Sequence, residues 1–362
     1  MQQTTTTTVS REEGIVHSKG YAAKEPKTAL EPFEFERRPV GDNDVLINIK
    51  YCGVCHSDIH TARSEWRGTK YPVVPGHEIV GEIVQVGKSV SKFKVGDRAG
   101  VGCMVDSCKK CDHCLAGQEE QCSRTVWTYN SPEGHIGGNT YGGYSSNIVV
   151  DENFALRISP DVDLASAAPL LCAGITTYSP LRRWKVGPGM KVGIVGLGGL
   201  GHMAVKLAHS MGAHVTVFTT SPSKKEDARR LGADDVVVSS DKAGMDMHAA
   251  KLDFVLDTVS ANHDIDTYLS LLKHGGAMVI VGLPTSPHTV AAESLVHWRR
   301  ILAGSVIGGI KETQEMLDYC AQNGVSSDIE LIPIQRINEA FERTVKGDVK
   351  YRFVIDMSSL GK

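Results

Sequence analysis

The chain has 362 residues, of which 41% are hydrophobic and 22% charged, and its formal net charge is −3. That length is sufficient for two domains. The slightly negative net charge argues against a nucleic-acid-binding protein, which usually carries an excess of basic residues. Because no apolar run approaches the length of a membrane span, we expect a soluble globular protein whose partners are small molecules rather than nucleic acid or membrane.

The chain begins with a polar stretch that includes five consecutive threonines, Thr4 to Thr8. This stretch lacks the apolar segment of a signal peptide, so residues 1–18 are predicted to be a disordered lead. Short strand-like runs with glycine punctuation follow between Phe33 and Val101. The first half of the chain is therefore predicted to be mainly β.

The strand-like pattern gives way near Leu164–Cys172 to a helix-forming stretch that is interrupted by Pro169. Strand and helix patterns then alternate from Lys191 to Val281, which predicts an α/β fold with a doubly wound parallel sheet. The tail from Lys311 to Leu360 carries two helical patterns and one strand, and it could return to the first domain. We therefore predict a first domain made of residues 19–160 and 311–362, and a nucleotide-binding domain made of residues 161–310.

A glycine-rich turn, Gly196–Gly201, separates the apolar run Met190–Val195 from a helical pattern that ends near Met211. A strand, a G-x-G-x-x-G turn and a helix together bind dinucleotide pyrophosphates, because the glycines permit close backbone approach and the helix start offers free N–H groups. Such turns also occur for packing reasons alone. The residues predicted to hold the cofactor here are Gly196, Gly198, Gly199, Leu200 and Gly201.

The choice of nicotinamide cofactor depends on the end of the second strand, predicted at His214–Phe218. An NAD enzyme needs an acidic residue there for the ribose 2′-hydroxyl, and none is present. Hydroxyls and two lysines would instead bind a 2′-phosphate, so NADP is the predicted cofactor. The residues concerned are Thr219, Thr220, Ser221, Lys224 and Lys225. They could also form a solvated helix start capped by Ser221 or Ser223, which is compatible with the first interpretation.

Nine cysteines are present, and all but Cys320 lie between Cys52 and Cys172. An odd number clustered in this way favours metal ligation over a disulfide framework, and it indicates a reducing, by default cytoplasmic, compartment.

Four of these cysteines have the spacing C-x2-C-x2-C-x7-C within a polar loop. Four thiolates so close together can surround a tetrahedral zinc ion, which would stabilise a loop that has few apolar residues. An iron–sulfur site is the alternative, since C-x2-C-x2-C also begins ferredoxin motifs. The structural-zinc ligands are predicted to be Cys108, Cys111, Cys114 and Cys122.

A second group is scattered along the chain as Cys55, His77 with Glu78, and Cys172. Taken singly, each could be a buried thiol or a core histidine. Two observations favour a site: Cys55 begins a segment crowded with polar side chains, and His77 follows a Pro-Gly pair that could aim its ring.

Five segments in chain order resemble the medium-chain zinc-dependent alcohol dehydrogenases. They are Tyr51–Asp58, Gly76–Glu78, Cys108–Cys122, Leu170–Tyr178 and Gly196–Gly201. Two further segments, Val126–Asn130 and Gly347–Asp356, resemble the cinnamyl alcohol dehydrogenase branch and its bacterial broad-range aldehyde reductase relatives. The resemblance extends from about Lys19 to the end. It implies a Rossmann domain beside a mainly β, GroES-like catalytic domain.

The resemblance also implies roles for single residues. Cys55, His77 and Cys172 would hold a catalytic zinc, with Glu78 close enough to replace an exchanging ligand; this Cys₂His set is the family's own. Asp58 would accept the second ring N–H of His77. Ser57 and His60 would relay the proton that an alcohol loses, although His60 could also be a surface residue without a role. Together with the four-cysteine loop, this predicts two zinc ions per chain.

The resemblance further implies reversible oxidation of a primary alcohol with NADP, used mainly as aldehyde reduction. Trp66, Trp127 and Tyr129 are candidates for an aromatic substrate pocket, with plain core packing as the alternative. A polyol or sugar alcohol dehydrogenase and a catalytically silent zinc-containing binding protein are the competing hypotheses. A homodimer is expected through the strand Ile301–Ile310 at the sheet edge.

Overall fold

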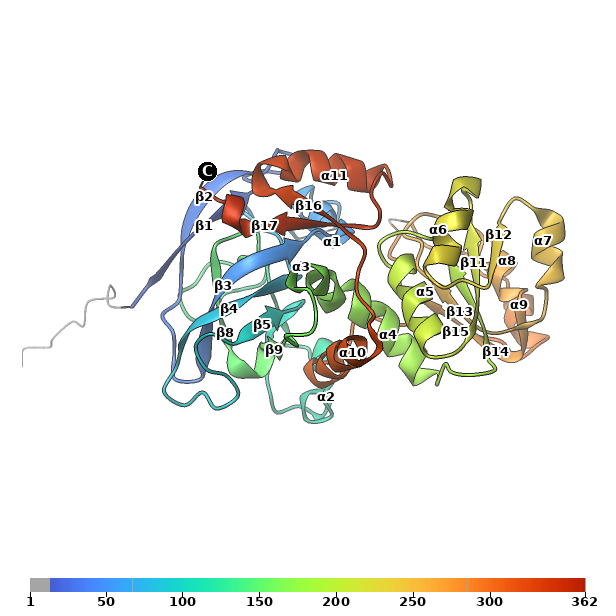
Figure 1. Cartoon of the computed structure of the whole chain (residues 1–362), viewed down its shortest axis with the longest axis horizontal. Coiled ribbons are helices and arrows are strands. Elements are labelled where there is room, and N and C mark those ends of the chain that lie inside the picture. The colour runs from blue at the N-terminus through green and yellow to red at the C-terminus, as the bar shows by residue number, and fades with distance from the viewer. Residues whose placement is uncertain (1–13, 67, 285, 362) are drawn as a thin grey trace, which may run out of the picture.

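The strand β3 (Asp44–Gly53) is the centre of the first of two large sheets. Its Val45, Ile47 and Ile49 side chains are buried and alternate with more exposed residues, the pattern of a strand with one face on a core. The computed structural model describes residues 14–66, 68–284 and 286–361. Within them the chain forms two lobes that lie side by side (Figure 1).

The sheet of the first lobe has the order β16-β17-β3-β4-β5-β9, with β8 also paired to β3. Its other strands are β4 (Ile79–Val86), β5 (Arg98–Val101), β8 (Asn147–Asp151), β9 (Leu156–Arg157), β16 (Ile329–Pro333) and β17 (Arg352–Asp356). Because β17 pairs antiparallel with β3, the end of the chain lies beside residues some 300 positions earlier. That pairing brings Arg352 next to the segment that carries Cys55.

Two short strands, β1 (Val16–Ala22) and β2 (Glu31–Arg37), form an antiparallel pair on the outside of this lobe. Residues 16–18 therefore belong to a strand, and the predicted disordered lead extends too far at its C-terminal end. Pairing along the whole of β1 satisfies its backbone groups, which the residue composition alone did not indicate. Residues 1–13 of the predicted lead lie outside the described residues.

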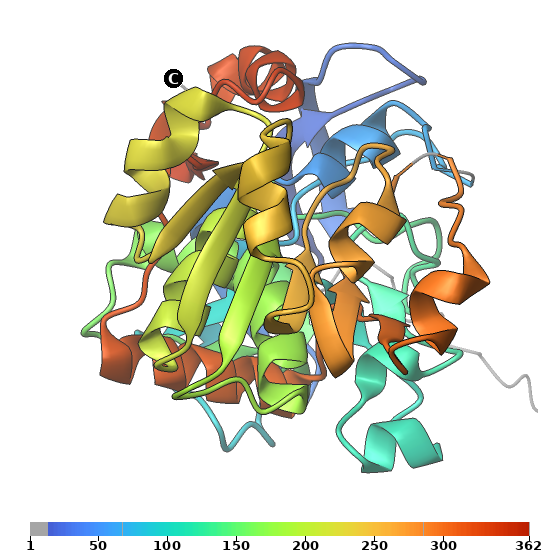
Figure 2. The same ribbon diagram turned by 90° about the vertical axis from the view of Figure 1, so that its right-hand side faces the viewer.

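The second lobe contains a six-stranded parallel sheet in the order β12-β11-β10-β13-β14-β15. Helices cover both of its faces (Figures 1 and 2). This is the doubly wound order 3-2-1-4-5-6, whose direction reverses between β10 and β13 and opens a crevice at the carboxyl ends of those strands. Its strands are β10 (Lys191–Val195), β11 (His214–Thr219), β12 (Asp235–Val238), β13 (Leu252–Asp257), β14 (Leu272–Ile280) and β15 (Ile301–Gly304).

The helices of the second lobe follow the strands in alternation, as the sequence predicts. Their bounds are α5 (Gly201–Ser210), α6 (Lys225–Arg230), α7 (Lys242–Met247), α8 (Ile265–Leu269) and α9 (Ala292–Val296). The edge strand predicted over Ile301–Ile310 ends at Gly304, so the prediction is wrong for residues 305–310. Ile307 has a positive φ of 34° and Gly309 caps the next helix, and neither conformation continues a strand.

Helices α4 (Ala173–Arg183) and α10 (Ile310–Asn323) connect the two lobes (Figure 1). Helix α4 packs against both α5 and α10, while the preceding α3 (Leu164–Ala167) and 3₁₀ turn η3 (Ala168–Leu171) pack on the first sheet. Helix α11 (Ile337–Val345) covers that lobe beside α1 (His56–Ala62).

The four-cysteine loop lies between β6 (Met104–Asp106) and β7 (Val126–Trp127) and contains α2 (Asp112–Leu115) and the turn η1 (Glu119–Gln121). The remaining short turns are η2 (Glu152–Phe154), η4 (Pro222–Lys224), η5 (Ile334–Arg336) and η6 (Met357–Ser359). Among the described residues, no helix combines the length and apolar character that crossing a membrane requires.

Candidate active site and metal centres

Cys55 lies at the N-cap of α1, where a reciprocal capping box fixes its position. The Asp58 side chain accepts a hydrogen bond from the Cys55 backbone N–H at 2.9 Å, and the Cys55 sulfur faces the backbone N–H of Asp58. A cysteine thus takes the place that serine or threonine usually has in this motif. The local sequence therefore holds the Cys55 sulfur at one defined point beside the helix start.

His77 follows Gly76, which adopts a positive φ of 102°. A Cβ atom at that position would lie 2.7 Å from the Tyr144 ring and 2.8 Å from the Cys52 sulfur, so only glycine fits. The tight turn directs the imidazole of His77 into the lobe. Its Nε2 atom is buried and has no hydrogen-bond partner among the described residues.

Cys172 occupies the junction between η3 and α4, and its sulfur lies 3.9 Å from that of Cys55. Cys55, His77, Glu78 and Cys172 are all buried, and their potential ligand atoms all lie within 4.8 Å of one another. The structure thus gathers four residues that are up to 117 positions apart. Two sulfurs and an unpartnered imidazole nitrogen are a donor set that suits zinc.

The Asp58 carboxylate is fully buried and accepts from several directions. Besides Cys55, it accepts from the Gly76 backbone N–H at 3.0 Å and from the Tyr144 hydroxyl at 3.0 Å, and it lies 3.2 Å from Nδ1 of His77. A carboxylate on Nδ1 keeps the proton there and leaves Nε2 free as an acceptor of a metal ion. Asp58 therefore lies within reach of Nδ1 of His77, and its role remains a prediction.

Glu78 forms a buried ion pair with Arg352 from β17. One carboxylate oxygen of Glu78 takes part, while its Oε2 is buried without a partner among the described residues. Burial raises the pKa of the Glu78 carboxyl well above its ordinary value, and the charge of Arg352 opposes this. The free oxygen is a further ligand atom within the group.

The electrostatics of the group also favour a thiolate. The hydrogen bond with Cys172 holds the pKa of the Cys55 thiol well below its ordinary value, and the positive charge of Arg352 acts in the same direction. A thiolate is the form that binds a metal ion.

Ser57 and His60 both lie on α1, beside this group. The Cys55 sulfur and the Ser57 hydroxyl are 3.6 Å apart. Nδ1 of His60 lies 2.5 Å from a carboxylate oxygen of Glu65, and the ring stacks on Trp66 with centroids 4.8 Å apart. The ring is therefore held on two sides.

The aromatic residues proposed for the pocket have different surroundings. Tyr129 is buried, with its ring centroid 5.6 Å from that of His77, and burial raises the pKa of its hydroxyl well above the ordinary value. Trp66 contacts His60. Trp127 lies on β7 with 39% of its surface exposed.

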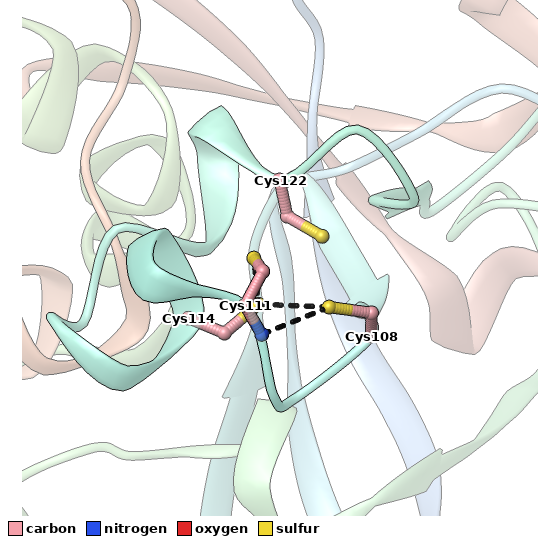
Figure 3. A group of neighbouring side chains, drawn as sticks. All are labelled: Cys108, Cys111, Cys114 and Cys122. Atoms are coloured by element: carbon pink, nitrogen blue, oxygen red, sulfur yellow. Dashed lines mark hydrogen bonds between the residues drawn. The ribbon is translucent and has the colours of Figure 1, made fainter.

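The second cysteine group is confined to the loop between β6 and β7, and Figure 3 shows its four side chains converging. Backbone N–H groups donate to the sulfurs, from Cys111 to Cys108 at 3.3 Å and from Arg124 to Cys122 at 3.3 Å. Hydrogen bonds from the backbone of Lys110 and Cys111 lower the pKa of the Cys108 thiol to about 6. The four sulfurs, within 4.8 Å of one another, suit a tetrahedral zinc ion.

The glycine turn connects β10 to α5 in the crevice of the second lobe. Gly196 has a φ of 88°, and a Cβ atom on Gly201 would lie 2.2 Å from the Gly196 carbonyl oxygen. The strand and helix can therefore approach only because these residues lack side chains. A Cβ atom on Gly199 would lie 2.9 Å from the Arg352 guanidinium, which places the turn beside the Glu78–Arg352 ion pair.

The segment after β11 approaches the same turn. The Lys224 amine donates to the Leu197 carbonyl at 2.7 Å, and burial lowers its pKa. Thr219 is buried and its hydroxyl accepts from the Ser221 backbone N–H at 3.2 Å, whereas Thr220 and Lys225 are exposed. Ser221 occupies the N-cap position of the turn η4, as the capping alternative expects, but its side chain makes no cap hydrogen bond.

Comparison with known proteins agrees with this arrangement. Residues 41–160 match the family described as alcohol dehydrogenase GroES-like domain, and residues 199–322 match the zinc-binding dehydrogenase family. The aldehyde reductase YahK of Escherichia coli K12 is 57% identical over 342 residues, which cover 94% of this chain and 97% of that protein. The chain belongs to the zinc-binding alcohol dehydrogenase family.

Two solved structures resemble this dehydrogenase closely. A cinnamyl alcohol dehydrogenase from Sorghum bicolor has a TM-score of 0.93 and 45% identity, over 96% of this chain and 100% of that one. The CAD of Helicobacter pylori, complexed with NADP(H), has a TM-score of 0.91 and 45% identity, over 95% and 99%. These findings confirm the family and the fold class predicted from the sequence.

Two residues of this alcohol dehydrogenase escaped the sequence reasoning. Arg352 lies in the segment Gly347–Asp356, which resembles the cinnamyl alcohol dehydrogenase branch, and a lone arginine near the C-terminus carries no spacing signal. Tyr144 reaches Asp58 across 86 positions, and no local pattern distinguishes it from a core aromatic residue. The contacts of Arg352 with Glu78 and of Tyr144 with Asp58 depend on the pairing of segments that are distant in the sequence, which local sequence cannot specify.

Proposed function

We propose that this protein is a zinc-dependent oxidoreductase that transfers a hydride between NADP(H) and a primary alcohol or aldehyde, and that it acts mainly as an aldehyde reductase. The observation that carries the proposal is the convergence of Cys55, His77 and Cys172, buried in the first lobe while Arg352 extends from Glu78 to the glycine turn of the second. One arginine thus connects the metal-binding group with the cofactor cradle.

Cys55, His77 and Cys172 would hold the catalytic zinc, with Glu78 as an exchanging ligand. The fit is supported by the buried Nε2 of His77 and Oε2 of Glu78, which have no other partner in the described part of the chain. A bound zinc supplies a Lewis acid that polarises a carbonyl oxygen. Asp58 keeps the His77 proton on Nδ1, so that Nε2 can act as a ligand.

Ser57 and His60 would carry the proton between the reacting oxygen and solvent. Ser57 lies next to the Cys55 sulfur, and His60 lies one turn further along the same helix. The contact with Glu65 orients the His60 ring, and stacking on Trp66 restricts its rotation. Histidine suits this task because its ordinary pKa is close to neutral.

NADP is the proposed cofactor, held by Gly196, Gly198, Gly199, Leu200 and Gly201 and by the segment after β11. The segment 219–225 contains hydroxyls and two lysines but no carboxylate that would repel a 2′-phosphate. Lys224 already lies over the glycine turn through its contact with Leu197. The similarity to a solved NADP(H) complex supports the same choice.

This cofactor assignment can be tested by introducing a negative charge after the end of β11. Ser221→Asp should weaken NADPH binding at least tenfold and improve NADH binding, because a carboxylate repels the 2′-phosphate and accepts from a 2′-hydroxyl. Lys242→Asp, on exposed surface at the start of α7, is the matched control. An equal loss for both cofactors in Ser221→Asp would contradict the assignment.

An aromatic wall made by Trp66, Trp127 and Tyr129 would favour planar or apolar aldehydes. Initial rates with aromatic, terpenoid and aliphatic aldehydes, each with NADPH and NADH, test the substrate class. A polyol or sugar alcohol as the preferred substrate would support the competing enzyme hypothesis. No turnover with any of these substrates, from zinc-loaded protein, would favour the catalytically silent alternative.

The metal content and assembly state are part of the same proposal. We propose two zinc ions in the Cys55 and Cys108 groups and a homodimer formed along β15, in a reducing compartment such as the cytoplasm. β15 is the edge of its sheet, and its Ile301 side chain is exposed. Val296, Trp298 and Val306, which lie just before and after the strand in the sequence, are exposed too. Light scattering on purified protein tests the dimer, which Ile301→Lys should dissociate.

A further inference from the structure

A third group of metal-ligand residue types lies at the carboxyl end of β13, apart from both cysteine groups. Asp257 is the last residue of β13, His263 precedes α8, and His288 lies in the connection that follows β14. Their potential ligand atoms lie within 4.8 Å of one another. The proposed reaction assigns no role to any of them.

Asp257 is 0% exposed, which is costly for a carboxylate that lacks a positive partner. One of its oxygens accepts from the Val259 backbone N–H at 3.1 Å, and the other lies 3.0 Å from Nε2 of His263. Among the described residues, no lysine or arginine forms an ion pair with it. The positive charge must therefore come from His263 or from a bound cation.

His263 has an acceptor at each ring nitrogen. Nδ1 lies 2.8 Å from the Ala261 carbonyl oxygen and Nε2 lies 3.0 Å from Asp257. A neutral imidazole has only one N–H and satisfies only one of them. If the proton is on Nδ1, it is donated to the Ala261 carbonyl, and a cation between Nε2 and the Asp257 carboxylate satisfies both of those groups. Metal-binding histidines commonly have such a carbonyl partner.

His288, the third residue of the group, has a ring nitrogen that is unpartnered in the described part of the chain. Its Nε2 is buried and has no hydrogen-bond partner among the described residues, and its ring meets that of His263 edge to face with centroids 5.0 Å apart. A buried imidazole nitrogen without a partner destabilises the fold. A ligand shared with His263 and Asp257 removes this cost.

We propose that Asp257, His263 and His288 form a third metal site, which binds a divalent first-row transition ion such as Zn²⁺ through one carboxylate oxygen and two imidazole nitrogens. Two imidazoles and a carboxylate suit this class of ion, with water in the remaining positions. Neither the catalytic nor the structural zinc ligands take part. The proposal is therefore independent of the proposed reaction.

The position of the site gives the ion a structural task. It would tie the connection after β14 to the end of β13, where Gly282 packs so closely on Val259 that a Cβ atom would lie 2.2 Å from the Val259 carbonyl oxygen. A Cβ atom on Gly196 of the glycine turn would lie 2.8 Å from a methyl carbon of Val259. The ion would thus stabilise the floor of the dinucleotide crevice, and its removal should weaken NADPH binding severalfold.

The experiment compares zinc content at equilibrium in the full-length protein. Wild type, His288→Phe and His274→Phe are dialysed against the same low-micromolar Zn²⁺, and zinc per chain is measured by elemental analysis. His274 is an exposed histidine on β14 and controls for non-specific surface binding. We expect His288→Phe to bind one zinc fewer than the other two proteins. Equal zinc content in all three overturns the proposal.

Thermal unfolding separates loss of the site from loss of the fold. In protein that keeps the zinc of both cysteine groups but receives no further Zn²⁺, replacing an unpartnered nitrogen by a carbon should leave the stability of His288→Phe at or above that of wild type. Added Zn²⁺ should raise the Tm of wild type more than that of His288→Phe. An equal rise in both proteins overturns the proposal, whether or not the enzyme reduces aldehydes.

Discussion

The two cysteine-containing groups of the first lobe use the same ligand chemistry in opposite surroundings. Cys55, His77 and Cys172 come from three distant segments, are buried and have Asp58, Glu78 and Arg352 packed around them. The four-cysteine loop gathers its ligands from 15 consecutive positions, Cys108 to Cys122, near the surface. Its sulfurs contact backbone N–H groups and no buried carboxylate.

This difference in surroundings suits the Cys55 group to catalysis and the four-cysteine loop to stabilising the fold. A site assembled by the tertiary fold can retain an unsatisfied atom, such as Nε2 of His77, and a free carboxylate oxygen on Glu78. A loop whose four sulfurs face one point leaves an ion no open coordination position. Such a loop also has few apolar contacts that could hold it in place without the ion. The first group should control turnover and the second should control folding.

The largest expected effect is on turnover. Cys172→Ala should lower kcat about 1000-fold, because losing a zinc ligand removes several kcal/mol of transition-state stabilisation at about 1.4 kcal/mol for each tenfold. Secondary structure and the Tm should change little. Steady-state kinetics and circular dichroism measure both. Cys320→Ala, a buried cysteine outside both groups, is the control.

A variant in the four-cysteine loop should instead lower stability and leave turnover nearly unchanged. Cys111→Ser should lower the free energy of unfolding by several kcal/mol, because the structural ion contributes folding energy directly. The fraction that stays folded should keep kcat within about threefold of wild type, since no loop sulfur belongs to the Cys55 group. Thermal unfolding and active-site titration measure these quantities. A large loss of kcat in fully folded protein would remove the distinction between the two groups.

A smaller effect is expected from the carboxylate behind His77. Asp58→Asn should reduce zinc affinity or kcat about 10–100-fold, because the amide no longer holds the Nδ1 proton in the same way. Tyr144→Phe deletes one donor to Asp58 and should have a smaller effect in the same direction. Zinc loss to a chelator, followed with time, ranks the variants. The reverse ranking would show that Tyr144 matters for reasons other than Asp58.

The smallest effect concerns pH and the four-cysteine loop. The pKa of Cys108 is lowered to about 6, so this sulfur is already a thiolate at pH 7 and becomes protonated as the pH falls through 6. Protons compete with zinc, and uptake by the metal-free loop should weaken severalfold between pH 7 and pH 5. Chelator competition across this range measures it. Unchanged uptake below pH 6 would contradict the lowered pKa.

Much of the second lobe could be predicted because its signals are local. The alternation of apolar strands with helices, the glycine turn and the missing acid after β11 all lie within short stretches of chain. The errors occurred at ends: the edge strand stops at Gly304, and the predicted lead includes part of β1. Such limits depend on which backbone partners are present, and these come from elsewhere in the chain.

The sequence by itself determined the cysteine spacing of the four-cysteine loop, the glycine pattern of the cofactor turn and, through resemblance, the prediction of the catalytic ligands. Only the tertiary structure decided what surrounds them. The Glu78–Arg352 ion pair, the Tyr144 contact with Asp58 and the meeting of Asp257 with His263 and His288 depend on strand pairing, chain return or loop closure. Local patterns fix a residue's conformation, but burial and charge depend on distant neighbours, as Glu78 depends on Arg352, which lies 274 positions away. Those two quantities set the chemistry of a site.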